Sequence, residues 1–133
     1  MTLKWSTVVV VFAVLSIIMG ELFSFYNTYW WWDLMLHTMC GALLTFFFRD
    51  IYKHNNIDIS DKNLMFIVVG LSVNTLVIWE ILEYWADTHL NLNMQKDGIK
   101  DTMEDLIVGK VGCMFYVVWY YVMPTVKLYR RKL

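Results

Sequence analysis

The sequence is poor in the residues that usually interrupt regular structure. Among 133 residues there are one proline and six glycines, and we find no repeat, low-complexity tract or second domain. There are only two cysteines, Cys40 and Cys113, each inside an apolar run and neither in a CxxC pair. We interpret both as small core residues, because free cysteine packs as a small hydrophobe.

Strong net charge is also lacking. The formal net charge is -1, so no basic character argues for nucleic acid as a partner. No nucleophile motif, phosphate-binding glycine loop, haem histidine pair or glycosidase-like carboxylate arrangement is present. Instead, the chain is rich in apolar side chains: 59% of residues are hydrophobic, 17% are aromatic and the mean hydropathy is +0.48. This composition predicts a membrane protein.

Four segments are apolar for long enough to cross roughly 30 Å of hydrocarbon, which takes about 20 residues. We predict an all-α membrane protein, a four-transmembrane-helix bundle in a single domain, residues 1–133, with spans at about 5–26, 30–48, 63–86 and 102–123. Pro124 is expected to end the last span. The first segment is too long for a signal-peptide core and lacks an A-x-A site, so it is kept as a helix.

The distribution of basic residues predicts the orientation. The N-terminus, the loop 49–62 and the C-terminal tail would share one side, which then holds Lys4, Arg49, Lys53, Lys62, Lys127, Arg130, Arg131 and Lys132. The opposite side holds only Lys96 and Lys100. Short loops rich in Lys and Arg stay in the cytoplasm. We therefore expect a multi-pass protein of the cytoplasmic membrane with both termini inside.

Ionisable residues recur near the outer end of every predicted span. At 1.5 Å per residue His37 and Glu80 lie about 10 Å inside their helices, and the whole set is Glu21, Asp33, His37, Glu80, Glu83, Asp87, Asp101, Glu104 and Asp105. Each charge within a span costs at least about 2.5–3.5 kcal/mol on insertion scales, so such groups usually face the bundle interior and mark a site. Their common depth predicts one polar cluster.

So many acids cannot all be anionic together in a low dielectric. Protons, Lys110 or a metal cation must neutralise them. A histidine with carboxylates from facing helices is a ligand set of helical-bundle metal sites. We predict a divalent metal ion (Zn, Mn or Fe) held by Asp33, His37, Glu80, Glu83, Asp101 and Asp105.

Simpler interpretations stay open for several of these residues. Thr102 to Asp105 reads as a capping box, whose acids would complement the helix dipole. Asp33 and Asp87 could be solvated at the interface, and His37 could be a hydrogen-bonded core histidine. Glu80 could be a protonated acid bonded to a neighbouring helix. Lys110 could be a catalytic cation, although we favour an ion pair with Asp105.

Three motifs carry a family resemblance. The stretches "WWDLMLHTMCGALL", "WEILEYWAD" and "NMQKDGIKDTMEDLIVGKVG" together resemble small bacterial integral membrane proteins of the YjdF type, related to the VanZ-like group, over Trp31 to Gly112. The resemblance implies a site that contains Asp33, His37, Glu80, Glu83, Gln95, Asp101 and Asp105. The chain departs from the pattern at Gly109, where an acid or amide is common. VanZ-like proteins are linked to glycopeptide resistance and the cell envelope.

Three functions compete on this basis. The first is a metal-dependent enzyme that acts on a lipid or lipid-linked envelope substrate at the outer leaflet, with Glu83 as the base. The second is a cation-binding, proton-binding or transport component without bond chemistry. The third is a structural or immunity protein. The sequence leaves open whether the protein is an enzyme, and also its substrate, its metal and its oligomeric state.

Overall fold

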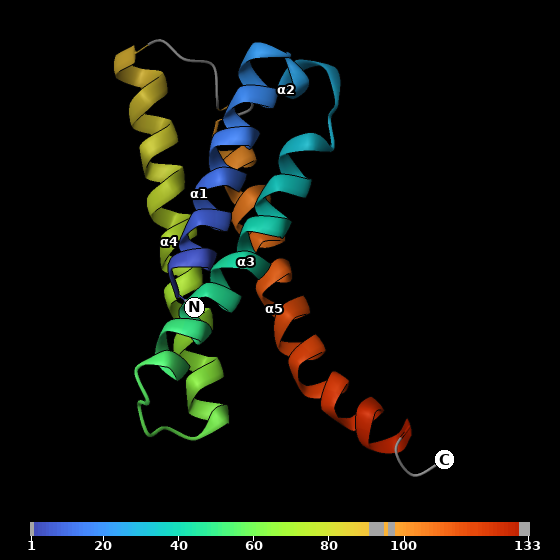
Figure 1. Cartoon of the computed structure of the whole chain (residues 1–133). Helices are drawn as coiled ribbons and strands as arrows, with labels where there is room; N and C mark the ends of the chain where they lie inside the picture. Colours follow the sequence, from blue (N-terminus) through green and yellow to red (C-terminus); the bar gives the residue numbers. More distant parts are fainter. Residues whose placement is uncertain (1, 91–94, 96–97, 131–133) are drawn as a thin grey trace.

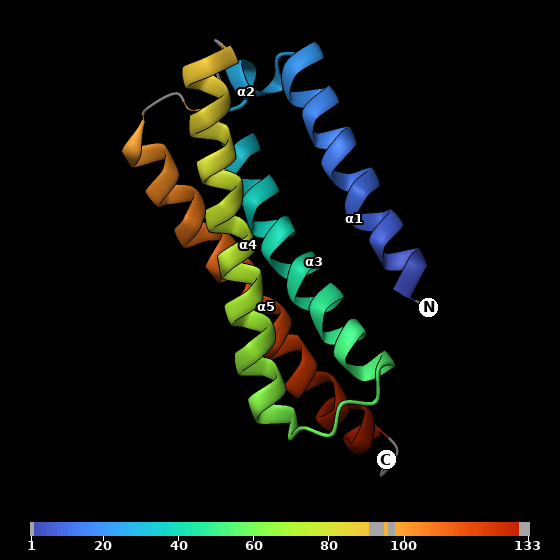
Figure 2. The same cartoon turned by 90° about the vertical axis from the view of Figure 1, so that its left-hand side faces the viewer.

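The computed structural model describes residues 2–90, 95 and 98–130, except for the side chains of residues 2–6, 21 and 124–130. Within these residues all regular structure is helical, which confirms the predicted all-α class. The elements in chain order are α1 (Thr2–Ile17), the π-helical turn η1 (Ile18–Leu22), α2 (Phe25–Thr28), α3 (Trp32–His54), α4 (Asp61–Leu90) and α5 (Ile99–Arg130). The helices α1 and α4 run toward the end of the bundle that holds α2, and α3 and α5 run away from it (Figures 1 and 2).

In the part of the chain that the structure describes, three helices, α3, α4 and α5, are long and apolar enough to cross a membrane. The first predicted span is represented by a shorter apolar stretch, Thr7–Gly20. The structure therefore supports a helical membrane protein with three candidate spans.

The chain turns earlier than predicted after its first helix. The expected span continues to Tyr26, but the α-helix ends at Ile17, a π turn follows, and Ser24 takes a left-handed conformation with φ of 56°. The Tyr26 ring folds back onto Gly20, where an added Cβ would overlap it. This fold-back is possible because glycine has no side chain, and the predicted continuous helix over 5–26 is therefore wrong.

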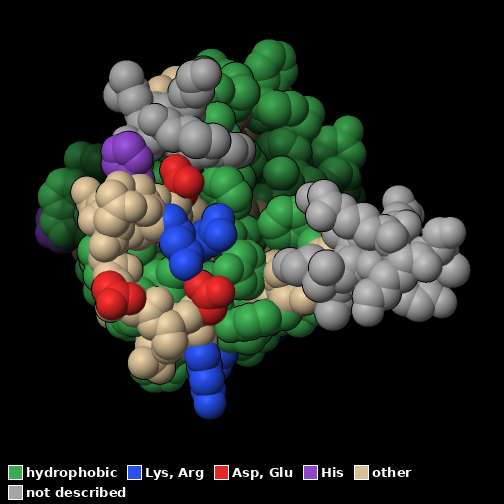
Figure 3. Space-filling view, turned by 60° about the horizontal axis from the view of Figure 1, so that its bottom comes forward, with side chains coloured by type: hydrophobic (Ala, Val, Ile, Leu, Met, Phe, Trp, Pro, Cys, Tyr) green, Lys and Arg blue, Asp and Glu red, His purple; other side chains and the backbone are tan. Residues whose placement is uncertain are grey.

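The other helices extend past their predicted ends. The loop expected from Arg49 is still helical as far as His54, and Lys53 Nζ bonds Asp61 Oδ1 at 2.7 Å across the short connection to α4. Charged side chains gather on this end of the molecule (Figure 3). The helix α5 passes through Pro124 to Arg130, so the prediction that Pro124 ends it is wrong. A proline inside a helix removes one backbone hydrogen bond, which can kink the helix without ending it.

The central helix is α3, which packs most extensively on α5 and also contacts α4 and α1. Glycines permit the close approach of α3 and α5: a Cβ on Gly41 would overlap the Gly109 carbonyl oxygen, and one on Gly112 would overlap the Thr38 carbonyl oxygen. Cys113 is fully buried here and its Sγ lies 3.4 Å from the Gly41 oxygen, which confirms it as a small core residue. Cys40 is only half-buried.

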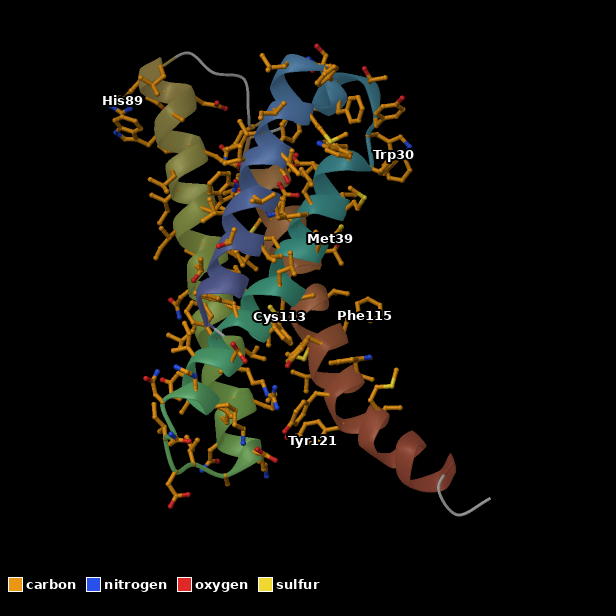
Figure 4. All side chains as sticks on the ribbon, viewed as in Figure 1. Trp30, Met39, His89, Cys113, Phe115 and Tyr121 are labelled. Atoms are coloured by element: carbon orange, nitrogen blue, oxygen red, sulfur yellow. The ribbon has the colours of Figure 1, made fainter. Side chains whose placement is uncertain are left out.

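The apolar core occupies the middle of the bundle and the end that holds the α3–α4 connection. Leu64, Met65 and Val68 of α4 pack there against Tyr116 of α5. Side chains such as Met39 and Phe115 point away from the helices, as expected for surfaces that face lipid (Figure 4). Toward the opposite end, the interior of the bundle holds buried ionisable side chains instead: His37, Glu80, Glu83 and Asp105.

Candidate metal centre

His37 stands at the meeting point of three helices. It is buried in α3, and Asp33 lies one turn earlier in the same helix. Its Nδ1 lies 3.5 Å from Glu80 Oε1 of α4, and its Nε2 lies 3.6 Å from Asp33 Oδ1 and 3.8 Å from Asp105 Oδ2 of α5. Asp33, Glu80 and Asp105, which depth and helical spacing predict to cluster with His37, are thus brought together around one imidazole ring.

Four members of this cluster are shielded from solvent, whereas the Asp33 side chain is 21% exposed. Residue exposure is 5% for His37, 3% for Glu80, 7% for Glu83 and 2% for Asp105. Buried polar atoms are nearly always hydrogen-bonded, because an unsatisfied one costs about 1–3 kcal/mol. Even so, several buried polar atoms of this cluster have no hydrogen-bond partner in the described part of the chain. They are His37 Nδ1, both carboxylate oxygens of Glu80 and Asp105 Oδ1. The orphaned atoms point to a bound species that would satisfy them.

The spacing of the atoms is slightly wider than that of ligands around a shared ion. Direct N–H···O bonds to ionised groups are about 2.7–2.9 Å long, shorter than any of the His37 contacts. Two ligands each about 2.0–2.2 Å from one ion, as for zinc, lie roughly 3–3.5 Å apart. One candidate group is Asp33, His37 and Asp105, and the other is His37, Glu80 and Glu83; the donor atoms of each lie within 4.8 Å of one another.

Each of the two candidate ligand groups lies beside a different ring nitrogen of His37. Nε2 faces the acids of α3 and α5, whereas Nδ1 faces Glu80. A histidine that binds metal through one nitrogen usually donates its other N–H to a carboxylate, which fixes the ring. The first group therefore fits a three-ligand site with Nε2 as the nitrogen ligand. Glu80 is the carboxylate that faces Nδ1, at 3.5 Å and without hydrogen-bond geometry.

Glu83 is held by a residue that the sequence reasoning missed. Trp79 Nε1 donates to Glu83 Oε1 at 2.6 Å from one turn earlier in α4. The spacing of four residues on a helix was the available signal. Glu83 is thus positioned beside the cluster by its own helix.

The remaining predicted residues lie around the cluster. Asp101 is half-buried and belongs to neither ligand group. Asp87 accepts a 2.8 Å hydrogen bond from the backbone N–H of Gln95, and Gln95 Nε2 donates to Thr102 Oγ1 at 2.9 Å. The Gln95 and Thr102 side chains also approach Glu80 without reaching hydrogen-bond geometry. These two bonds link Asp87 of α4, through Gln95, to Thr102 in the first turn of α5.

Two alternatives proposed for α5 are wrong. A capping box from Thr102 is excluded because the helix begins at Ile99, after Gly98 with φ of 58°, and the Thr102 hydroxyl accepts from Gln95. Asp101 does lie in the first turn of α5, where an acid complements the helix dipole. Lys110 is exposed on α5 while Asp105 is buried, and among the described side chains no ion pair joins them. Glu21 lies in η1, but its side chain is outside the described residues.

A depression leads to the cluster from the end of the bundle that holds α2. It encloses about 730 Å³, and both Asp33 and Asp105 line it together with Asp101, Glu104 and residues of the α1–α3 connection. Two acids of the first ligand group can therefore be reached from one surface of the molecule.

The fold and the cluster define a class, the helical membrane proteins that gather ionisable side chains inside the bundle. Residues 1–125 match the model of the family described as "Predicted membrane protein (DUF2238)", and the chain belongs to this family. A protein of Thermotoga maritima named "Uncharacterized protein" is 35% identical over 100 residues, which are 72% of this chain and 50% of that relative. The chain thus spans about half the length of this relative. No solved structure matches. The resemblance to the YjdF type and the VanZ-like group stays a prediction.

Proposed function

We propose that this chain is a metal-dependent membrane enzyme that acts on a lipid or lipid-linked cell-envelope substrate. The observation that carries the proposal is the buried His37, with a carboxylate from a different helix facing each ring nitrogen. His37 Nε2, Asp33 and Asp105 would hold one divalent ion, Zn, Mn or Fe. Three protein ligands leave positions open for water and substrate, as in catalytic metal sites.

The chemistry follows from these positions. A divalent ion would polarise a phosphoryl or carbonyl oxygen of the substrate, or activate water. Glu83 lies beside the cluster and is held by Trp79, which suits it to accept a proton. Lys110 is exposed on α5, and we assign it no part in the reaction.

Elemental analysis of the purified protein tests the proposal. After purification without chelator we expect about one metal ion per chain, and loss of that ion in His37→Ala, because a three-ligand site cannot spare its only nitrogen donor. Glu80→Gln should keep the site but weaken its affinity about 10–100-fold, as for other residues that orient a metal ligand.

The matched control is His89→Ala. His89 is exposed near the end of α4 and stacks on Trp85, away from the cluster (Figure 4). It should keep the metal content of the wild type. Protein without stoichiometric metal, or metal content that His37→Ala leaves unchanged, would sink the proposal.

Cation binding without bond chemistry is the second candidate. Asp101 and Glu104 line the depression that leads to Asp33 and Asp105, so acids mark a route for a cation. This candidate requires metal binding that saturates, without turnover of any membrane lipid. Release of a product from a lipid substrate would exclude it as the whole function.

We further propose that the first apolar helix also spans, giving four spans in the cytoplasmic membrane with both termini in the cytoplasm. The excess of Lys and Arg near the termini and in residues 49–62 supports this orientation. A green fluorescent protein fused after Leu133 should fluoresce, because the reporter folds only in the cytoplasm. A fusion to the chain truncated after Leu90 should stay dark, and the reverse pattern would contradict the orientation.

A further inference from the structure

A second hollow reaches the cluster from within the bundle. It is an apolar cleft between α1, α3 and α4, and its polar wall is formed by Asp33, His37 and Glu83. Asp33 also lines the outer depression, as does Tyr26. The His37 cluster therefore stands where an apolar cleft meets a polar, surface-facing depression.

Each helix contributes a regular stripe to this cleft. On α3 the lining residues run from Asp33 through His37 and Cys40 to Leu44, at helical spacing. On α4 they run from Leu76 through Trp79 to Glu83. Both stripes are apolar toward the middle of the bundle and ionisable at the α2 end, so the cleft has a polar end and an apolar end.

One face of α1 closes the cleft. Val9, Phe12, Ala13, Ser16 and Ile17 line it at spacings of three and four residues. The other face of the helix is exposed, with 59% of Val10 and 49% of Val14 accessible. The helix α1 packs on α3 and lies apart from α4 and α5 (Figure 2).

The dimensions of the cleft select its occupant. The α3 stripe from Asp33 to Leu44 spans about 16 Å at 1.5 Å per residue, close to one leaflet of a hydrocarbon core of roughly 30 Å. The enclosed space is only about 90 Å³, less than the cavity of about 150 Å³ that holds one benzene ring. A ring system or a pair of chains would not fit, and a single chain would place a few methylene groups in the enclosed part and lie along the open groove for the rest of its length.

We propose that this cleft binds one acyl chain of a membrane lipid and presents the lipid headgroup to the His37 cluster. The proposal rests on the proposed function and narrows its substrate to an amphiphile whose reacting group lies at the head of an acyl chain. The headgroup would occupy the depression beside Asp33 and Asp105, and the chain would lie against Ala13 and Cys40.

Photo-crosslinking tests the assignment on the full chain. The probe is a phosphatidylglycerol with a diazirine midway along one acyl chain, incorporated into nanodiscs with the purified protein. We expect crosslinks at cleft residues such as Ala13 and Cys40 to exceed those at the adjacent lipid-facing Val14 and Met39 by about tenfold, the ratio that a site preferred by 1.4 kcal/mol gives. Equal labelling of the two faces would show annular lipid only and overturn the proposal.

Matched variants sharpen the test. Ala13→Phe fills the cleft and should reduce cleft labelling about tenfold, whereas Val14→Phe adds the same ring on the exposed face and should leave it unchanged. If Ala13→Phe fails to fold, the ratio of the two faces in the wild type still decides the question.

Metal content measured on the same samples separates this inference from the proposed function. Bound metal with equal labelling of both faces would overturn the acyl-chain site alone. Selective labelling of the cleft without metal would support the acyl-chain site and overturn the metal centre.

Discussion

Replacing Gly112 by alanine is expected to destabilise the protein strongly. The new Cβ would overlap the Thr38 carbonyl oxygen of α3, and a backbone atom cannot move aside as a flexible side chain can. The two helices must separate along the most extensive contact of the fold. Overpacking of this kind costs about 1–3 kcal/mol, measured as a loss of thermal stability in detergent.

Gly70→Ala is the matched control. A Cβ at Gly70 meets no atom within 4 Å, so this variant has the same gain in helix propensity without the collision. We expect it to be at least as stable as the wild type. If the two variants melt at the same temperature, α3 and α5 do not pack as closely as described.

Asp105→Asn is expected to make the protein less stable than the wild type when metal is present, but not when metal is absent. At a metal concentration of 100 times Kd, the bound ion stabilises the wild type by about 2.7 kcal/mol. If the substitution weakens metal affinity about 100-fold, the ion would stabilise the variant by only about 0.4 kcal/mol at the same metal concentration. In excess chelator the variant should be at least as stable as the wild type, because one acid has been removed from a buried group of like charges.

Thermal melts of both proteins, with metal and with chelator, measure this reversal. Glu104→Gln is the control, because it removes one acid from the exposed face of the same helix. The Glu104 Oε1 atom lies 3.7 Å from Lys100 Nζ. It should respond to metal as the wild type does. Melting temperatures of the wild type that are identical with metal and with chelator would refute the metal centre.

The helices and the cluster could both be predicted from the sequence, but for different reasons. Span length is set by membrane thickness, so the apolar runs located α3, α4 and α5. Their starts lie two or three residues from the predicted ones, and their ends lie four to seven residues beyond. The cluster was accessible because ionisable residues inside spans turn inward, and spacings of three and four residues place Asp33 with His37 and Glu80 with Glu83 on common faces. Depth and helical face together were sufficient to gather the main residues.

Which acid faces which nitrogen of His37 depends on tertiary packing and could not be predicted from the sequence. No pattern in the sequence shows that His37 Nδ1 faces Glu80 while Nε2 faces Asp105. The error at Lys110 was avoidable, because five residues at 3.6 per turn rotate a side chain about 140° away from Asp105. The early turn after Ile17 depends on the fold-back of Tyr26 onto Gly20, a contact that composition does not reveal.

The spread of the cluster over three helices has a consequence for biosynthesis. Asp33 and His37 enter the bilayer with α3, Glu80 and Glu83 with α4, and Asp105 only with α5. A helix that entered the lipid alone would carry its ionisable groups without partners, at a cost of about 2.5–3.5 kcal/mol for each charge. The nascent chain is therefore expected to keep α3 and α4 together at the insertion machinery until α5 arrives, so that the centre is completed last.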